Sequence, residues 1–337
     1  MIQYQKKAKI PYCYGQAGNR QEDYNMSDLE GLKLIPPLQV PPEQFPESEE
    51  LPEGVKTVTW KDTYGFGVEF LPNVVYANRG GINLHLQIMV PKSGEEPDRK
   101  WPLIVFVQGS AWHKQDVFDH LPNLMRMAQR GFTIAIVEYR PSDIAPFPAQ
   151  VQDTKAAIRF MKINAGKYRV DADRTALWGD SSGGHTALMA GFTGDGEPDM
   201  DAYREQSAAV KCIVDWYGPT DIAKMNYYPS AMDHTQADSP EGYVIGRRNV
   251  LENPELADAT VPMNYLSREK ETPPLLIMHG GSDMLVPFNQ SCRLYERMRE
   301  LGKNVEFIKL AGANHGFMGF NCDEALDAVE GFLRKYI

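Results

Sequence analysis

The chain has 337 residues, of which 42% are hydrophobic and 24% are charged, and its formal net charge is −10 at pH 7. This composition is typical of a globular protein of one large domain or two smaller ones, which can bury its core without a metal or a disulfide. The negative charge argues against nucleic acid or an anionic membrane surface as a partner. The sequence contains no apolar run of about 18 residues or more, so no membrane span is predicted.

The chain termini and the cysteines give two further expectations. The first ten residues, MIQYQKKAKI, lack the continuous apolar core of a secretory signal, so the chain is expected to be cytoplasmic; a precursor that had lost its signal would look the same. The cysteines lie far apart and form no C-x-x-C pair, which predicts free thiols rather than a zinc site or a redox motif. They are Cys13, Cys212, Cys292 and Cys322.

Residues 1–54 differ in composition from the rest of the chain. They are polar, and six prolines fall between Pro36 and Pro52. Because proline blocks regular backbone ladders, this segment is expected to be an extended N-terminal extension packed on the surface of a catalytic domain, residues 55–337.

The segments that follow predict strands alternating with helices. Residues 55–60 alternate apolar and polar side chains, and residues 73–78 and 82–91 form a hairpin signal around a turn at 79–81. Later apolar runs predict strands at 103–107, 132–137, 174–180, 212–217, 275–279 and 305–310, and helical spacing occurs at 121–130, 148–162, 289–301 and 323–336. Continuous apolar strands between helices predict an α/β fold, with a mostly parallel sheet covered on both faces.

The segment 222–271 interrupts this alternation. It has little periodicity, but SPEGY from Ser239 and NPELA from Asn253 each place a capping residue before proline, which is a helix start. A loop of this length within a domain is usually functional. A lid or substrate loop is therefore predicted before the next strand, and a passive surface insertion is the alternative.

The sequence R-T-A-L-W-G-D-S-S-G-G at 174–184 predicts a nucleophile elbow with Ser181 at a sharp turn between strand and helix. Serine catalysis needs a base and an acid that orients the base, and in this fold they follow in the order acid, then histidine. Asp283 and His315 each come just after a late strand. Asp215 is the rival acid, and a structural role is expected for it.

The remaining histidines are assigned by their position. Those in strands or on the elbow helix are expected to be structural, namely His85, His185 and His279, whereas those in loops could line a pocket, namely His113, His120 and His234.

The oxyanion hole requires backbone N–H groups aimed at the developing negative charge. One is expected from Ser182, which follows the nucleophile, and the others from the loop Q-G-S-A-W at 108–112 after an apolar strand. Its small residues let the backbone approach a substrate, and Trp112 is expected to wall the pocket.

From about Val55 to Ile337 the chain resembles the α/β-hydrolase esterases, in particular the branch that holds hormone-sensitive-lipase-like esterases and bacterial carbohydrate esterases. The shared motifs are Y-G-P-T-D, S-P-E, H-G-x-x-D-x-x-V-P and G-x-x-H-G-F, which begin near Tyr217, Ser239, His279 and Gly312. Two motifs differ from those usual in this branch. The chain has Q-G-S-A-W where the branch has H-G-G-G-W, and G-D-S-S-G-G where the branch has G-x-S-A-G-G. The motif Q-G-S-A-W instead resembles that of a gut-bacterial subgroup described as bifunctional acetyl-xylan and feruloyl esterases.

This resemblance implies an α/β-hydrolase fold and a serine esterase acting through an acyl-enzyme, without metal or cofactor. It assigns the oxyanion N–H groups to Ser110, Ala111 and Ser182. The expected substrate is an acetyl or feruloyl ester of a xylan-type oligosaccharide. Aromatic side chains suit sugar rings and aromatic acyl groups, and the candidate binding residues are Trp112, Trp216, Tyr217, Tyr227, Tyr228, Arg247 and Arg248.

The alternatives are a general short-chain carboxylesterase, an amide-cleaving relative such as an aryl formamidase or serine peptidase, and a catalytically dead binding module. The expected partner is a small-molecule or oligosaccharide ester; an oligomer is compatible with the sequence.

Overall fold

The computed structural model describes residues 36–41, 44–48, 52–59, 66–94, 96–200, 202–316 and 319–337. By its contacts the chain divides into two units, Met1–Trp60 and Lys61–Ile337. Residues 1–35 of the predicted extension lie outside the described residues, so the packing of the extension on the core stays a prediction.

The prediction of a strand at 55–60 is wrong for residues 55–59, which form no regular structure. Trp60 lies outside the described residues. The Val58 side chain is 87% exposed. An alternating pattern gives a stable strand only where a neighbouring strand and an apolar face are available to it.

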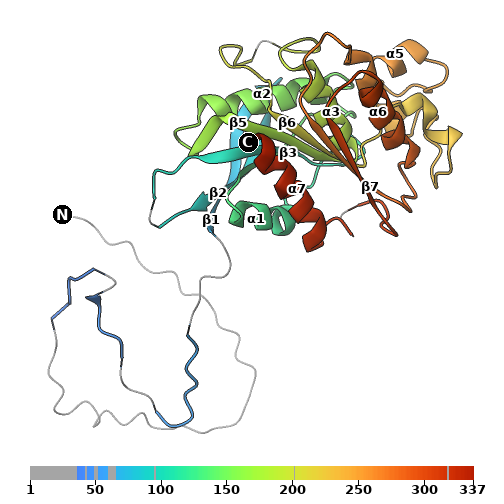
Figure 1. Ribbon diagram of the computed structural model, residues 1–337. Helices are drawn as coiled ribbons and strands as arrows, with labels where there is room; N and C mark the ends of the chain where they lie inside the picture. The colour runs from blue at the N-terminus through green and yellow to red at the C-terminus, as the bar shows by residue number, and fades with distance from the viewer. Residues whose placement is uncertain are drawn as a thin grey trace, which may run out of the picture. The chain divides into compact units, whose positions relative to one another are not determined.

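The second unit is built on an eight-stranded sheet with the order β1-β2-β4-β3-β5-β6-β7-β8 (Figure 1). The pairs β1–β2 and β2–β4 are antiparallel. The remaining pairs, from β4–β3 to β7–β8, are parallel. The strands are β1 Gly67–Arg79, β2 Ile82–Lys92, β3 Trp101–Val107, β4 Thr133–Val137, β5 Val170–Asp180, β6 Cys212–Trp216, β7 Leu275–Gly280 and β8 Val305–Leu310.

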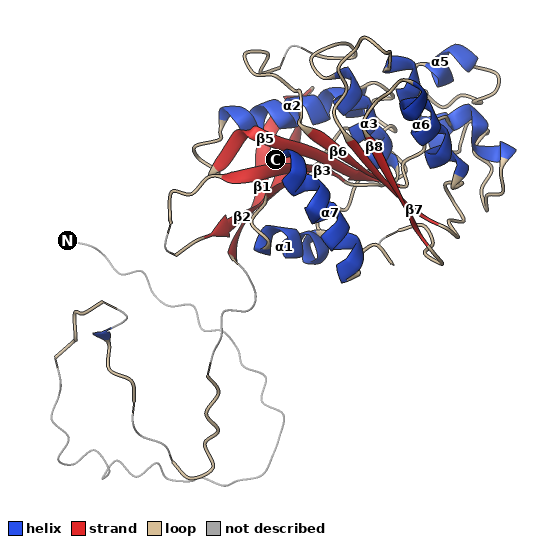
Figure 2. Ribbon diagram, viewed as in Figure 1, coloured by secondary structure: helices blue, strands red, loops and turns tan. Residues whose placement is uncertain are grey.

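Helices cover both faces of this sheet (Figure 2). The apolar residues of α2 (Ala149–Ile163), α3 (Ser182–Thr193) and α6 (Asn289–Glu300) pack in one core cluster, and those of α1 (Leu121–Gln129) and α7 (Asp323–Tyr336) pack in another. The central strands are buried along their whole length, as β3 and β4 show. The predicted α/β architecture is thereby confirmed.

The interrupting segment forms four short helices: η3 Ile222–Tyr227, α4 Pro240–Val244, α5 Pro254–Asp258 and η4 Pro262–Tyr265. As the sequence predicts, Ser239 caps α4, and its Oγ accepts a hydrogen bond from the Gly242 N–H at 3.0 Å. The helix start predicted at Asn253 also exists, as α5, although the Asn253 side chain makes no capping bond.

Two sequence expectations concern thiols and membranes. Cys212, Cys292 and Cys322 are free thiols, and Cys13 lies outside the described residues. Within the described ranges, no helix has the length and apolar character needed to cross a membrane.

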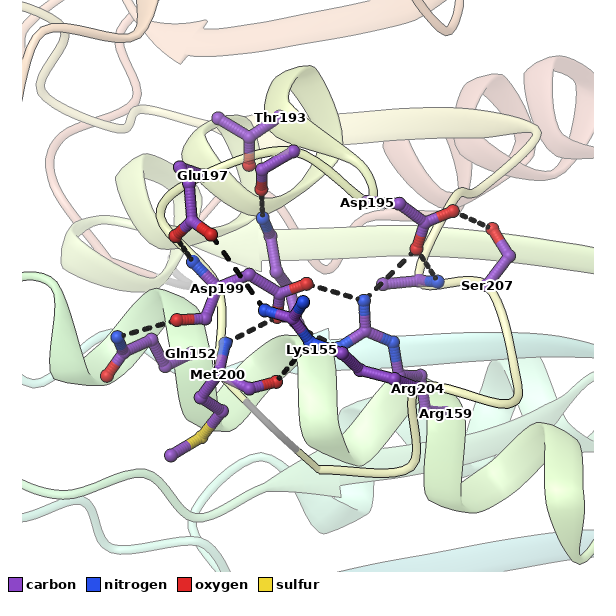
Figure 3. A network of polar contacts seen from close by, with 12 residues as sticks. Gln152, Lys155, Arg159, Thr193, Asp195, Glu197, Asp199, Met200, Arg204 and Ser207 are labelled. Atoms are coloured by element: carbon purple, nitrogen blue, oxygen red, sulfur yellow. Dashed lines mark hydrogen bonds and ion pairs between the residues drawn. The ribbon is translucent and has the colours of Figure 1, made fainter.

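A buried polar network fastens the loop after α3 to helix α2 (Figure 3). The Arg159 guanidinium forms two bonds with the Asp199 carboxylate, at 2.9 and 2.7 Å, and a third with Asp195 at 3.1 Å. The Lys155 ammonium donates to two carbonyls of the same loop, at 2.6 and 2.8 Å. Arg159 is thus paired with carboxylates and Lys155 is hydrogen-bonded to carbonyl oxygens, so both cations help to hold this loop.

Candidate active site

Ser181 occupies the sharp turn between the end of β5 and the start of α3, with φ 53° and ψ −128°. This conformation is strained for a residue that has a side chain. The flanking glycines are required by close approach of the backbone. A Cβ atom on Gly183 would lie 2.0 Å from the Val107 carbonyl oxygen, and one on Gly179 would lie 2.3 Å from the Gly183 carbonyl oxygen.

The predicted triad residues meet at the carboxyl ends of β5, β7 and β8. The Ser181 Oγ lies 2.9 Å from the His315 Nε2, and the His315 Nδ1 lies 2.9 Å from the Asp283 Oδ2. The carboxylate can only accept, so it places a hydrogen on Nδ1 and leaves Nε2 able to take the serine proton. The Tyr217 ring packs against the imidazole with 4.7 Å between centroids.

Asp283 is held in its ionised form. Its side chain is fully buried, and its Oδ1 accepts the N–H groups of Leu285 and Val286, each at 2.9 Å. Burial alone would raise the pKa of Asp283, but hydrogen bonds from His279 and His315 hold that pKa well below its usual range. The His279 Nε2 lies 3.2 Å from the Asp283 Oδ2, so His279 is structural, as expected, and positions the acid.

The oxyanion loop is fastened to the elbow by two hydrogen bonds. The Gly109 N–H donates to the Asp180 Oδ1, and the Ser110 N–H donates to the Ser182 Oγ, each at 2.9 Å. The second bond departs from the predicted oxyanion hole, because the Ser110 N–H already has an acceptor. Ser182 replaces the alanine usual in the resembling esterases, and its hydroxyl supplies that acceptor. Within the described residues, the N–H groups of Ser182 and Ala111 have no such acceptor.

A buried tyrosine supports the same loop from below. The Tyr139 hydroxyl lies 3.0 Å from the Ser110 Oγ, which donates to the His113 carbonyl at 2.7 Å. Burial raises the pKa of Tyr139 to about 12. The phenol therefore stays protonated and remains a hydrogen-bond donor at neutral pH.

A cavity of about 380 Å³ opens beside the nucleophile. Its walls include the loop 108–112, the triad residues Ser181 and His315, and four residues of the 222–271 segment, namely Met232, His234, Pro240 and Glu241. This segment therefore forms part of the cavity wall, as the substrate-loop prediction requires.

Only some of the predicted binding residues reach this cavity. Trp112 and Tyr217 line it. Trp216 does not, because its fully buried side chain packs on Trp178, with 4.7 Å between ring centroids. Trp216 and Tyr217 are both aromatic and both fully buried, so residue type alone did not indicate which of them faced the site.

Tyr227 and Arg247 also lie outside the walls of this cavity. The Tyr227 side chain is 76% exposed and borders a different surface pocket. The exposed Arg247 guanidinium stacks on the Tyr243 ring, 4.7 Å from its centroid. Tyr228 and Arg248 likewise lie outside the walls of the cavity.

The other histidines sort by their surroundings. His120 and His234 line the cavity, whereas the His113 Nδ1 pairs with the Asp143 carboxylate at 2.7 Å. The buried His185 bridges the Thr260 carbonyl at 2.7 Å and the Trp112 indole at 3.3 Å.

Asp215, the rival acid, is buried beneath the elbow. Its Oδ1 accepts the Gly218 N–H at 3.0 Å, and burial raises the pKa of its carboxyl to about 7. It makes no described hydrogen bond with His315, so the geometry places Asp283, and not Asp215, beside the imidazole.

The functional residues that sequence reasoning missed are Asp180, which anchors the oxyanion loop, and Glu241, which lines the cavity. Asp180 occupies the variable position of the G-x-S-x-G motif, and Glu241 lies in a recognised helix-start motif. Neither pattern indicates where the side chain points.

Comparison with known proteins assigns the chain to a family. Residues 86–298, more than half of the chain, match the family described as BD-FAE. Esterase LipC of Mycobacterium tuberculosis (strain ATCC 25618 / H37Rv) is 29% identical over 227 residues, an alignment that covers 66% of this chain and 54% of that protein. Esterase LipQ of the same strain is 27% identical over 224 residues, covering 66% and 51%. The chain thus spans about half the length of the curated relatives it matches.

Solved structures agree on the fold. A truncated form of a carbohydrate esterase from gut microbiota is 28% identical, with a TM-score of 0.71 over 81% of this chain and 97% of that chain. A bifunctional GH43-CE protein of Bacteroides eggerthii is also 28% identical, with a TM-score of 0.68 over 79% of this chain and 38% of that chain. The eight-stranded sheet, the elbow and the family match together show that the chain belongs to the BD-FAE family and has the α/β-hydrolase fold.

Proposed function

We propose that this protein is a serine carboxylic-ester hydrolase that removes acetyl or feruloyl groups from xylan-type oligosaccharides. The observation that carries the proposal is the contact of Ser181, His315 and Asp283 through two hydrogen bonds of 2.9 Å each. This arrangement activates a serine for acyl transfer.

In the first half-reaction, the His315 Nε2 takes the proton of the Ser181 hydroxyl while the Oγ forms a bond with the ester carbonyl carbon. Asp283 holds the imidazole by Nδ1 and stabilises its charged form. The N–H groups of Ser182 and Ala111 bind the oxyanion. Collapse of the tetrahedral intermediate breaks the bond to the leaving alcohol, which receives its proton from His315.

The second half-reaction repeats these steps with water. His315 removes a proton from water as the water oxygen attacks the acyl carbon. The intermediate then releases the carboxylic acid, and the proton returns to the Ser181 Oγ. The enzyme ends the cycle in its starting form.

Three observations support a carbohydrate ester as substrate. The family match and the two structures named as carbohydrate esterases favour this class. The cavity of about 380 Å³ lies within the usual range for small-molecule sites. Two aromatic residues, Trp112 and Tyr217, back the cavity wall and are themselves almost fully buried; an aromatic lining suits sugar rings or a feruloyl group.

The test is mass spectrometry of the products from acetylated and feruloylated xylo-oligosaccharides. The wild type should release acetate or ferulate, and Ser181→Ala should reduce turnover by roughly 10⁴-fold or more. The control variant Ser267→Ala, at a residue outside the cavity, should retain wild-type turnover. Near-wild-type hydrolysis by Ser181→Ala would refute the mechanism. Hydrolysis of 4-nitrophenyl acetate without release of either acid would instead favour a general carboxylesterase.

A further inference from the structure

A second histidine–carboxylate pair lies in the wall of the cavity that holds the triad. Glu241, in the first turn of α4, and His234, in the preceding loop, both line this cavity. The His234 Nδ1 lies 2.9 Å from the Glu241 Oε1, and the two side chains are only 3% and 4% exposed. The catalytic cycle described above uses neither residue.

The surroundings of His234 favour its charged form. Its Nε2 lies 3.0 Å from the Leu285 carbonyl oxygen, which can only accept, and 2.8 Å from the Ser230 hydroxyl, which donates to the same carbonyl, so this nitrogen carries a hydrogen. Its Nδ1 faces a carboxylate and carries the second hydrogen. Burial would lower the pKa of His234, but the hydrogen bond and the charge of Glu241 outweigh burial and raise that pKa.

The ion pair leaves one carboxylate oxygen unused. The Glu241 Oε1 faces His234, whereas Oε2 is buried and has no hydrogen-bond partner among the described residues. A buried acceptor without a hydrogen bond costs free energy, and a donor from a bound ligand would remove that cost. Because His234 already balances the charge, the pair suits an uncharged donor, such as a hydroxyl group, better than a cation.

The pair is fixed in position relative to the triad. The Ala231 N–H donates to the Met284 carbonyl at 2.7 Å, and the Ser230 Oγ donates to the Leu285 carbonyl at 2.9 Å. Both carbonyls belong to the loop that follows Asp283. Glu241 therefore keeps a set distance from the reacting atoms, which is what discrimination between substrates requires.

We propose that Glu241 is a specificity-determining residue, whose Oε2 accepts a hydrogen bond from a hydroxyl group of the ester substrate. The inference rests on the proposed function, since it presupposes ester hydrolysis at Ser181. A sugar hydroxyl next to the ester and the phenol of a feruloyl group offer the same chemistry, and the experiment distinguishes them.

The test compares wild type with Glu241→Gln. In the variant, the amide oxygen must face the His234 N–H, so an NH₂ donor replaces the acceptor in the cavity wall. The kcat/KM values are measured for acetylated xylo-oligosaccharide, methyl ferulate, methyl cinnamate and 4-nitrophenyl acetate. Each ester that carries the hydroxyl is compared with an ester that lacks it. In the variant, the ratio of their kcat/KM values should fall about tenfold or more.

The pairings identify the hydroxyl. A fall for acetylated xylo-oligosaccharide relative to 4-nitrophenyl acetate assigns it to the sugar, and a fall for methyl ferulate relative to methyl cinnamate assigns it to the phenol. The control Glu252→Gln removes an exposed carboxylate of the same segment and should leave both ratios at their wild-type values.

Two outcomes separate failure of this inference from failure of the proposed function. Unchanged ratios in Glu241→Gln, with ester hydrolysis intact in the wild type, would overturn the role of Glu241 alone. No hydrolysis of any ester by the wild type would overturn both proposals. If the single variant does not fold, the double variant His234→Gln/Glu241→Gln leaves no unpaired buried charge and should show the same selective fall.

Discussion

Protonation of His185 should loosen the contact between the oxyanion loop and helix α3, so replacing this histidine should reduce the sensitivity of the protein to acid. The buried ring donates from Nε2 to the Thr260 carbonyl at 2.7 Å and accepts from the Trp112 indole at Nδ1, at 3.3 Å. The indole N–H cannot accept a hydrogen. A proton on Nδ1 would therefore face another donor and break this contact.

Burial lowers the pKa of His185 from 6.5 to about 4, although the Thr260 carbonyl opposes this effect. The native state keeps the ring neutral in a pH range where the unfolded chain takes up a proton. The contribution to stability is therefore fully present above pH 6.5 and is lost as the pH falls toward 4. The separation of the two pKa values corresponds to about 3 kcal/mol, of which about 2 kcal/mol is lost by pH 5.

The measurement is urea unfolding of wild type and His185→Gln at pH 7 and pH 5. The variant should be less stable at pH 7, because glutamine cannot keep both contacts of the ring. Between the two pH values, however, the wild type should lose about 2 kcal/mol more free energy of unfolding than the variant. The control His113→Gln alters a half-buried ring and should keep the wild-type loss. Equal losses in wild type and His185→Gln would refute this account of the buried ring.

Three further variants test the elbow, the oxyanion loop and the polar network. Gly183→Ala puts a Cβ atom 2.0 Å from a backbone oxygen, so circular dichroism and 4-nitrophenyl acetate hydrolysis should show loss of the native fold or of activity. Asp180→Ala removes the acceptor of the Gly109 N–H and should lower kcat about tenfold or more in steady-state assays, with a smaller effect on KM. Lys155→Met leaves two loop carbonyls without their donor and should lower the free energy of unfolding by roughly 2–4 kcal/mol in urea titrations.

The fold and the meeting of the triad residues could be predicted because both follow from simple rules. Continuous apolar strands alternating with helices indicate a parallel sheet, and the carboxyl ends of its strands share one edge. Ser181, Asp283 and His315 each follow such a strand, so chain order alone brings them to that edge. The steric need for glycine at the elbow is equally local, since it depends only on the turn itself.

The details that escaped prediction depend on the direction of single side chains. Trp216 and Tyr217 are adjacent aromatic residues and both are buried, so residue type did not show which one faced the cavity. The Ser182 hydroxyl takes the Ser110 N–H, a choice of partner that sequence motifs do not encode. Glu241 lies in a segment without periodicity, where burial cannot be read from the pattern.

The two histidine–carboxylate pairs of this cavity differ in what lies beyond the imidazole, and this difference decides their chemistry. The His315 Nε2 faces the Ser181 hydroxyl, which has a proton to give, so this pair can transfer a proton to and from the reacting groups. The His234 Nε2 lies 3.0 Å from the Leu285 carbonyl, and the neighbouring Ser230 hydroxyl, at 2.8 Å, donates to the same carbonyl, so this ring keeps its hydrogen. A histidine and a carboxylate thus supply a general base in one wall and an anchoring ion pair in the other. Only the anchor leaves a carboxylate oxygen free to recognise a substrate.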